Sequence, residues 1–202
     1  MFAFLAGVAA GLLHVVSGPD HLAAVAPLAS DRERGQWLTG LQWGVGHTMG
    51  VLLIGALLLL FKEQLPIGVI SAYSERVVGA SLILIGGWGL RRAWVNARVL
   101  PCSGAEVHTH TGASFSMGTL HGLAGSSHLF GVLPALAFPS RVSSLLYLAG
   151  FGLGAVAGMT AFSVAVGLLS SKLRRSSRSY SGLLSVSSAF ALVVGGVWLV
   201  GR

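Results

Sequence analysis

Six apolar stretches, each long enough to cross a bilayer, set the limits on what this chain can fold into. A helix needs about 20 predominantly apolar residues to span the hydrocarbon core of a membrane. With 53% hydrophobic and 9% charged residues, the chain is too apolar for an ordinary soluble domain. We therefore predict an all-α, polytopic membrane protein whose six transmembrane helices cover roughly residues 2–29, 36–61, 69–92, 115–138, 143–170 and 181–201.

The distribution of basic residues predicts how the helices are oriented. Of the 13 Lys and Arg residues, nine fall in the loops after the first, third and fifth helices and four fall on the other side. Cytoplasmic loops carry the excess of basic residues, so we expect these loops in the cytoplasm and both termini outside. The formal charge of +7 is therefore explained by basic loops that orient the helices in the membrane, and we expect a lipid bilayer and no nucleic acid as partner.

The N-terminal segment carries ionisable residues where a signal peptide would be apolar, so we expect it to be retained as the first helix. We expect the protein in a bacterial plasma membrane.

A histidine-containing phrase occurs twice, about half a chain apart. The register pairs Gly11 with Gly118, His14 with His121, Gly18 with Gly125, His21 with His128, Leu22 with Leu129, and Pro27 with Pro134. A second glycine pattern, residues 44–50, returns at residues 152–158, and the offset drifts only from 107 to 109 along the chain. This predicts one membrane domain (1–202) made of a three-helix repeat (1–93), a connecting loop (94–114) and a second repeat (115–202). Because each copy has an odd number of helices, the second is inverted, a 3+3 plan common in secondary transporters.

The first helix is expected to be broken at Gly18 and Pro19. On a straight helix, His14 and His21 would lie roughly 10 Å apart along the axis, too far to share an ion. Proline removes a backbone donor and pushes the preceding residue out of the helical region. A break here brings Asp20 and His21 toward His14, and irregular backbone at membrane depth is tolerated around a protein-lined cavity.

These side chains have the chemistry of a metal path. A buried histidine by itself favours a structural hydrogen bond between helices, but four duplicated ones with His47 favour a metal. Imidazole suits late first-row divalent metals, whereas Mg²⁺ and Ca²⁺ prefer oxygen ligands. We expect His14, Asp20, His21 and His47 to bind the metal, and His121 and His128 to line its path from the other half.

The His-then-Asp-His phrase around Gly18-Pro19-Asp20-His21, followed by Gly46-His47-Thr48 in the next helix, resembles the nickel/cobalt transporter family and its compact, urease-associated branch. The resemblance implies a secondary permease for Ni²⁺ or Co²⁺ whose metal-selective residues are His14, Asp20, His21 and His47. This chain departs from the larger members by having five residues, not four, between the first histidine and the Asp-His pair, and six helices in place of eight.

Other readings of the same residues remain open. His108 and His110, in the loop after the third helix, are an accessory metal-capture candidate, although a two-histidine polar loop is more often only a solvated linker. With Cys102 as the only cysteine, an intramolecular disulfide and a paired-thiol relay are excluded.

We expect a transporter and not an enzyme, with no prosthetic group and with Zn²⁺ as an alternative cargo. The alternatives are a membrane metalloprotein or haem-handling protein that uses these histidines as cofactor ligands, and a subunit of a larger assembly or oligomer.

Overall fold

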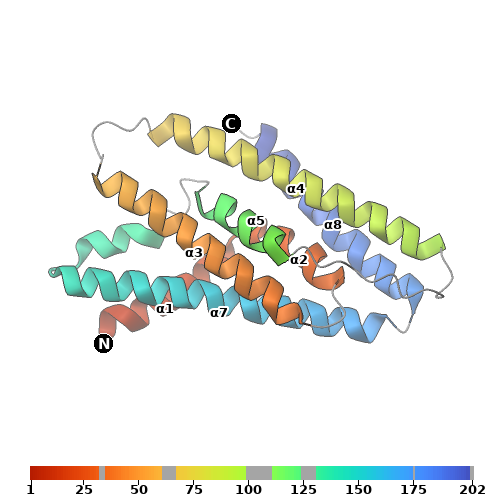
Figure 1. The fold of residues 1–202 in the computed structure, drawn as a ribbon, viewed down its shortest axis with the longest axis horizontal. Helices are drawn as coiled ribbons and strands as arrows, with labels where there is room; N and C mark the ends of the chain where they lie inside the picture. The colour runs from red at the N-terminus through yellow and green to blue at the C-terminus, as the bar shows by residue number, and fades with distance from the viewer. Residues whose placement is uncertain (32–34, 61–66, 99–110, 124–130, 175, 201–202) are drawn as a thin grey trace.

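The computed structural model describes residues 1–31, 35–60, 67–98, 111–123, 131–174 and 176–200. Every element in these ranges is helical (Figure 1). The elements are α1 (Phe2–Ser17), α2 (Pro19–Asp31), α3 (Gln36–Leu60), α4 (Ile67–Arg98), α5 (Thr111–Leu123), the short 3₁₀ helix η1 (Leu133–Ala137), α7 (Arg141–Leu173) and α8 (Ser177–Val200). The prediction of an all-α chain is therefore confirmed for the described residues.

The predicted first segment is two helices, as the Gly-Pro sequence indicated. α1 and α2 meet at Gly18 with a bend of 74°.

Two helix boundaries differ from the sequence-based expectation. Both ends of the connecting loop predicted at 94–114 are helical instead, because α4 continues to Arg98 and α5 begins at Thr111, while residues 99–110 lie outside the described part of the chain. The fourth predicted segment, 115–138, contains the end of α5 and the separate helix η1, with residues 124–130 outside the described part of the chain.

Two single helices, α7 and α8, are long and apolar enough to cross a membrane. The bent pair of α1 and α2 supplies a third span if it counts as one. Length and composition of the described residues thus support two to three spans and a membrane protein.

The helices pack in three main pairs. α1 lies along α7, α3 lies along α5, and α4 lies along α8, while α2 contacts both α7 and α8 (Figure 1). Each of the three main pairs joins one helix from the first half of the chain to one from the second half. The two halves are therefore interleaved and share one core.

The pair formed by α1 and α7 is parallel and is held at close range by glycines. A side chain at Gly7 would collide with the backbone carbonyl of Tyr147, and one at Gly11 with that of Phe151. Both residue numbers rise together along the contact, so the helices run in the same direction. Small residues four apart allow this close approach of helix backbones in membranes.

The pair formed by α3 and α5 repeats the arrangement. A Cβ at Gly46 would meet the backbone of Phe115, and one at Gly50 would lie 2.5 Å from the carbonyl oxygen of Thr119. In the opposite direction, Gly118 abuts the backbone of Trp43. This pair is also parallel.

The pair formed by α4 and α8 is antiparallel. A Cβ at Gly79 would lie 2.9 Å from the carbonyl oxygen of Gly195, and one at Gly86 would lie 2.7 Å from that of Ser188. As the number rises on α4 it falls on α8. Two parallel pairs and one antiparallel pair thus connect the halves.

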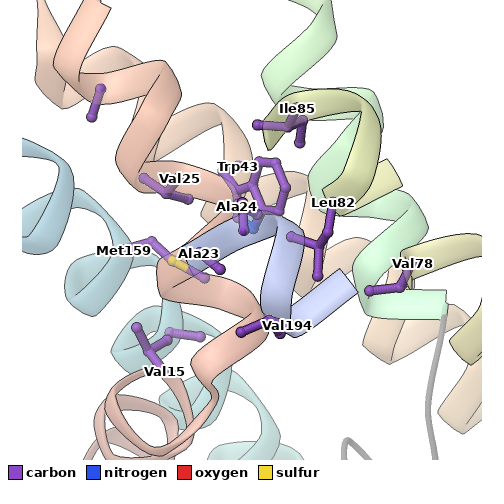
Figure 2. Packing of buried hydrophobic residues seen from close by; sticks show 13 residues of the cluster. Val15, Ala23, Ala24, Val25, Trp43, Val78, Leu82, Ile85, Met159 and Val194 are labelled. Atoms are coloured by element: carbon purple, nitrogen blue, oxygen red, sulfur yellow. The ribbon is translucent and has the colours of Figure 1, made fainter. Parts of the chain in front are cut away.

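A buried apolar cluster fixes α2 against the rest of the molecule. Trp43 is fully buried and packs with Ala23, Ala24 and Val25 of α2 and with residues of α4, α7 and α8 (Figure 2). The small alanines of α2 let this short helix enter the centre of the bundle. The cluster therefore positions the residues that directly follow the break at Gly18.

The C-terminal end of α2 is tied to α7 by hydrogen bonds. Ser170 Oγ donates to the carbonyl oxygen of Ser30 at 2.6 Å, and Arg174 Nη2 donates to the same oxygen at 3.1 Å. The last carbonyls of a helix have no partner within that helix and must be satisfied elsewhere. These bonds satisfy one of them and anchor α2 at the end opposite to the break.

Candidate metal site

The break at Gly18 brings two histidines of one chain segment together. Gly18 has φ −90° and ψ 98°, outside the helical region, and its N–H donates to the carbonyl oxygen of His14 at 3.1 Å. Pro19 starts α2, a position where the missing N–H costs little. As a result, the ring centroids of His14 and His21 lie 4.9 Å apart, about half of the separation along a straight helix.

His47 of α3 completes a group of three histidines. Its ring centroid lies 5.5 Å from that of His14 and 4.7 Å from that of His21. One ring nitrogen from each of the three histidines lies within 4.8 Å of the others. We call His14, His21 and His47 the three-histidine site.

The size of this group fits a small ion after a modest contraction. Late first-row metals bind imidazole nitrogen at about 2.0–2.1 Å, which places two ligands of a tetrahedral ion about 3.4 Å apart. His21 and His47 are 1% and 0% exposed, so such an ion would be largely shielded from solvent. To bind one tetrahedral ion, ring nitrogens now up to 4.8 Å apart would have to approach to about 3.4 Å.

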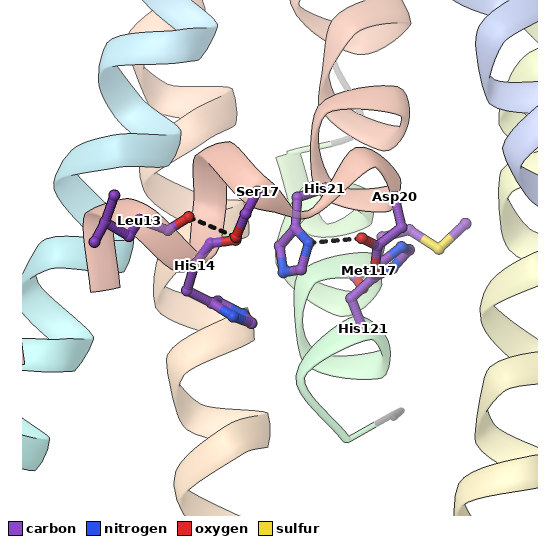
Figure 3. A network of polar contacts seen from close by, with 7 residues as sticks. All are labelled: Leu13, His14, Ser17, Asp20, His21, Met117 and His121. Atoms are coloured by element: carbon purple, nitrogen blue, oxygen red, sulfur yellow. Dashed lines mark hydrogen bonds and ion pairs between the residues drawn. The ribbon is translucent and has the colours of Figure 1, made fainter. Parts of the chain in front are cut away.

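Asp20 is hydrogen-bonded to His21 and so helps to orient one ring of the three-histidine site. Its Oδ1 accepts a hydrogen bond from His21 Nδ1 at 3.0 Å, and both side chains are buried (Figure 3). A carboxylate on the second nitrogen of a metal-binding histidine fixes the ring orientation and tautomer and raises its basicity. Asp20 therefore holds His21, while its predicted role as a direct ligand remains a prediction.

The pair of Asp20 and His21 requires glycine at the break. A Cβ on Gly18 would collide with His21 Nδ1 and lie 3.1 Å from Asp20 Oδ1. Any other residue at this position would push the imidazole away from the carboxylate. The sequence indicated that Gly18 ends a helix, and its place under the His21 ring adds a second reason for glycine.

The structure also places His121 beside this group. Its ring centroid lies 6.2 Å from that of His21 and 4.9 Å from that of Trp43, and its side chain is fully buried. His121 Nδ1 lies 3.2 Å from the carbonyl oxygen of Met117, one turn earlier in α5. The remaining sequence-predicted candidates, His128, His108 and His110, lie outside the described residues.

Two aromatic neighbours of the histidines were not among the predicted site residues. Phe151 of α7 packs against His14 with ring centroids 5.4 Å apart, and Trp43 packs against His121. In the sequence, neither Trp43 nor Phe151 carried a signal that distinguished it from other aromatic residues in apolar helices. Only the packing of α1 on α7 and of α3 on α5 reveals these contacts.

Comparison with known proteins places the chain among named relatives. It is 39% identical over 180 residues to the chloroplast protein FOR GROWTH AND FERTILITY 2 of Arabidopsis thaliana, a match covering 83% of this chain and 48% of that protein. It is 36% identical over 208 residues to the chloroplast protein FOR GROWTH AND FERTILITY 1 of the same plant, covering 94% of this chain and 56% of that protein. The chain thus spans about half the length of both plant relatives.

A more distant match covers most of both partners. The chain is 26% identical over 204 residues to the urease accessory protein UreH of Bacillus sp. (strain TB-90), covering 94% of this chain and 86% of that protein. No protein-family description matches the chain, and no solved structure matches it. The chain is therefore a homologue of the two plant chloroplast proteins and a distant homologue of the urease accessory protein UreH.

Proposed function

We propose that this chain is a membrane permease for divalent late first-row transition metals, with Ni²⁺ or Co²⁺ as its cargo and Zn²⁺ as a competing one. The observation that carries the proposal is the three-histidine site, in which ring nitrogens from both sides of a helix break and from α3 lie within 4.8 Å of one another. Ionisable side chains at membrane depth are costly and usually mark an ion path. The proposed function therefore rests both on the imidazole ligands and on their place at a helix break in a membrane protein.

The donor set favours this class of metal. Imidazole is a good ligand for Ni²⁺, Co²⁺ and Zn²⁺, whereas Mg²⁺ and Ca²⁺ prefer sites made of oxygen atoms. Since Nδ1 of His21 is hydrogen-bonded to Asp20, we expect Nε2 to be its ligand atom. The Asp20 carboxylate also offsets part of the charge of a divalent cation in a buried place.

The helix break suits a transport site better than a purely structural one. Secondary transporters place their substrate near the middle of the bilayer, at discontinuous helices whose ends face the ion. The bend of 74° between α1 and α2 supplies such a discontinuity directly beside the three histidines. A structural histidine that only links two helices needs no such break.

The packing of the two halves supports the six-helix, inverted-repeat plan. In an inverted repeat of three helices, the first helix of each copy runs parallel to the second helix of the other, and the third helices run antiparallel. The chain has this pattern, with α1 beside α7, α3 beside α5, and α4 beside α8. Equivalent contacts recur at the repeat offset, because Gly11 abuts Phe151 and Gly118 abuts Trp43. Alternating access by relative movement of the two copies is part of this proposal.

The relatives bear on cargo and location differently. The distant relative is named as a urease accessory protein, which agrees with the resemblance to the urease-associated branch of the nickel/cobalt transporters. The two plant relatives are named as chloroplast proteins and give no support to a bacterial plasma membrane. The proposal is therefore an integral membrane protein, and the orientation with both termini outside remains a prediction.

The main alternative is a resident cofactor such as haem. A porphyrin between two histidines needs a flat slot between their rings. Here the three imidazoles pack directly against one another, with centroid separations of 4.7 to 5.5 Å. This arrangement favours a bare ion, and we propose no second function.

Equilibrium binding to the purified protein tests the proposed site. We expect saturable binding of Ni²⁺ or Co²⁺ to the wild type, with affinity reduced more than about 100-fold in His47→Ala because a direct ligand is lost. Ser171→Ala, which changes an exposed hydroxyl on α7, is the matched control and should bind as the wild type does. Equal affinity in His47→Ala and the control would refute the three-histidine site.

A further inference from the structure

His121 has the chemical arrangement of a metal ligand that the three-histidine site does not use. A carbonyl oxygen only accepts hydrogen bonds, so His121 Nδ1 carries the proton that it donates to Met117 at 3.2 Å. In the neutral ring, Nε2 then bears the lone pair. That atom is buried and has no hydrogen-bond partner among the residues that the structure describes. Metal-binding histidines characteristically donate their other N–H to a backbone carbonyl or a carboxylate.

The position of His121 relative to His21 indicates where an ion would go. His21 lies between His14 on one side and Asp20 and His121 on the other (Figure 3). Its ring centroid is 4.9 Å from that of His14 and 6.2 Å from that of His121. The ring of His21 therefore lies close to imidazoles from both halves of the chain.

His121 also occupies the place in the second half that His14 occupies in the first. His14 packs against Phe151 of α7, and His121 packs against Trp43 of α3, at centroid distances of 5.4 and 4.9 Å. These pairs are related by the same offset as the glycine contacts. The second half has Ala155 at the position of His47, so it lacks the third imidazole.

We infer that His21 and His121 form a second position for the metal ion, which the ion enters from the three-histidine site. This inference rests on the proposed transport function. The metal–nitrogen bonds to His14 and His47 break, a bond to His121 Nε2 forms, and a water molecule takes the coordination position left open, while His21 stays bound throughout. All ligands exchanged are neutral, so the charge of the ion and its ligands does not change.

The geometry also links this transfer to a movement of the protein. The His21–His121 separation exceeds each of the three separations within the three-histidine site, which run from 4.7 to 5.5 Å. An ion shared by His21 and His121 would join α2 to α5. Because these helices belong to different halves of the chain, relative movement of the halves would change the His21–His121 separation and with it the binding of the ion. Since both positions use His21, one chain holds one ion at a time.

The experiment separates binding from transport. Ni²⁺ affinity is measured by equilibrium dialysis of the purified protein, and Ni²⁺ flux is measured in sealed proteoliposomes. The variants are His121→Ala, His47→Ala and the control Thr119→Ala, whose hydroxyl bonds only within α5 among the described residues. For His121→Ala we expect a dissociation constant within about threefold of the wild type, and a flux at least about tenfold lower. His47→Ala should lose both binding and flux.

Two results would overturn this inference. One is a flux in His121→Ala equal to that in Thr119→Ala. The other is a loss of affinity in His121→Ala as large as in His47→Ala, which would make His121 part of the first position. By contrast, no Ni²⁺ binding in the wild type would refute the proposed function itself. If His121→Ala is not recovered folded, His121→Asn keeps a donor near the position of Nδ1 for the Met117 carbonyl and has no ligand atom at the position of Nε2, and the same separation of binding from flux is expected.

Discussion

His21 Nδ1 donates to Asp20 Oδ1 across 3.0 Å, directly after the break that separates α1 from α2. The bond joins two neighbouring residues, and the absence of a side chain on Gly18 leaves room for it. Both partners are buried, so the carboxylate acts on the imidazole with little competition from water. The orientation of His21, the ring at the centre of the proposed metal path, therefore depends on Asp20.

Replacing Asp20 should weaken metal binding without removing a member of the three-histidine site. Asp20→Ala is expected to lower Ni²⁺ affinity by about 10- to 100-fold, the usual cost of losing a carboxylate that orients a histidine ligand. Asp20→Asn keeps an oxygen acceptor for His21 and should fall at the smaller end of that range. Equilibrium dialysis measures both, with Ser17→Ala as the neighbouring control. Wild-type affinity in Asp20→Ala would refute this role.

Gly18 should tolerate no side chain, for a reason specific to the site. In Gly18→Ala the new methyl group would collide with the His21 ring, so we expect Ni²⁺ affinity to fall at least about tenfold. Gly182→Ala is the matched control, because a Cβ there meets no atom within 4 Å. The control should bind Ni²⁺ normally and keep its stability within about 0.5 kcal/mol. Equal binding by the two variants would contradict the geometry of the break.

The glycine contacts between the halves should contribute equally to stability. Gly11→Ala and Gly118→Ala each drive a methyl group into a facing helix backbone, at Phe151 and Trp43 respectively. We expect each to destabilise the protein by about 1–3 kcal/mol, the usual cost of overpacking. Thermal unfolding in detergent checks this, with Gly196→Ala, which faces open space, as control. Unfolding midpoints of both variants equal to that of the control would count against the interleaved packing.

The ends of α7 should lie on opposite sides of the membrane. This helix has 33 residues and is about 50 Å long, enough to cross a bilayer. In a Cys102→Ser background, Ser140→Cys and Ser176→Cys place single thiols at exposed positions just outside the two ends. An impermeant maleimide added to intact cells should label Ser140→Cys alone, since the basic loop after α7 is expected in the cytoplasm. Labelling of both thiols from the same side would exclude a span by α7.

Sequence patterns predicted the parts of this molecule that depend on local chemistry. The apolar segments gave the helices, and the Gly-Pro pair at Gly18 gave the break, because proline and glycine act on their own neighbourhood. The spacing of His14 and His21 then made the bend a requirement for a shared ion. The extension of α4 to Arg98 was not predicted, since a helix can continue beyond its apolar stretch.

Features that depend on the approach of distant segments were harder to predict. The contacts of Phe151 with His14 and of Trp43 with His121 arise only when α7 meets α1 and α3 meets α5. The same holds for the hydrogen bond between Asp20 and His21, because the side-chain directions after a break depend on how the second helix packs. The inclusion of His47 in one group with both histidines was predicted from chemistry, and the packing of α3 on the other helices brings it there.

Metal flux into sealed proteoliposomes tests the central claim most directly. Purified wild type, His21→Ala and Ser17→Ala would be reconstituted at equal density and supplied with Ni²⁺, Co²⁺ or Zn²⁺ outside. The account predicts saturable Ni²⁺ or Co²⁺ entry in the wild type and Ser17→Ala, and loss of that entry in His21→Ala. Equal flux in His21→Ala and the wild type, or no flux of any metal through a wild type that binds it, would contradict the proposal of a permease built on these histidines.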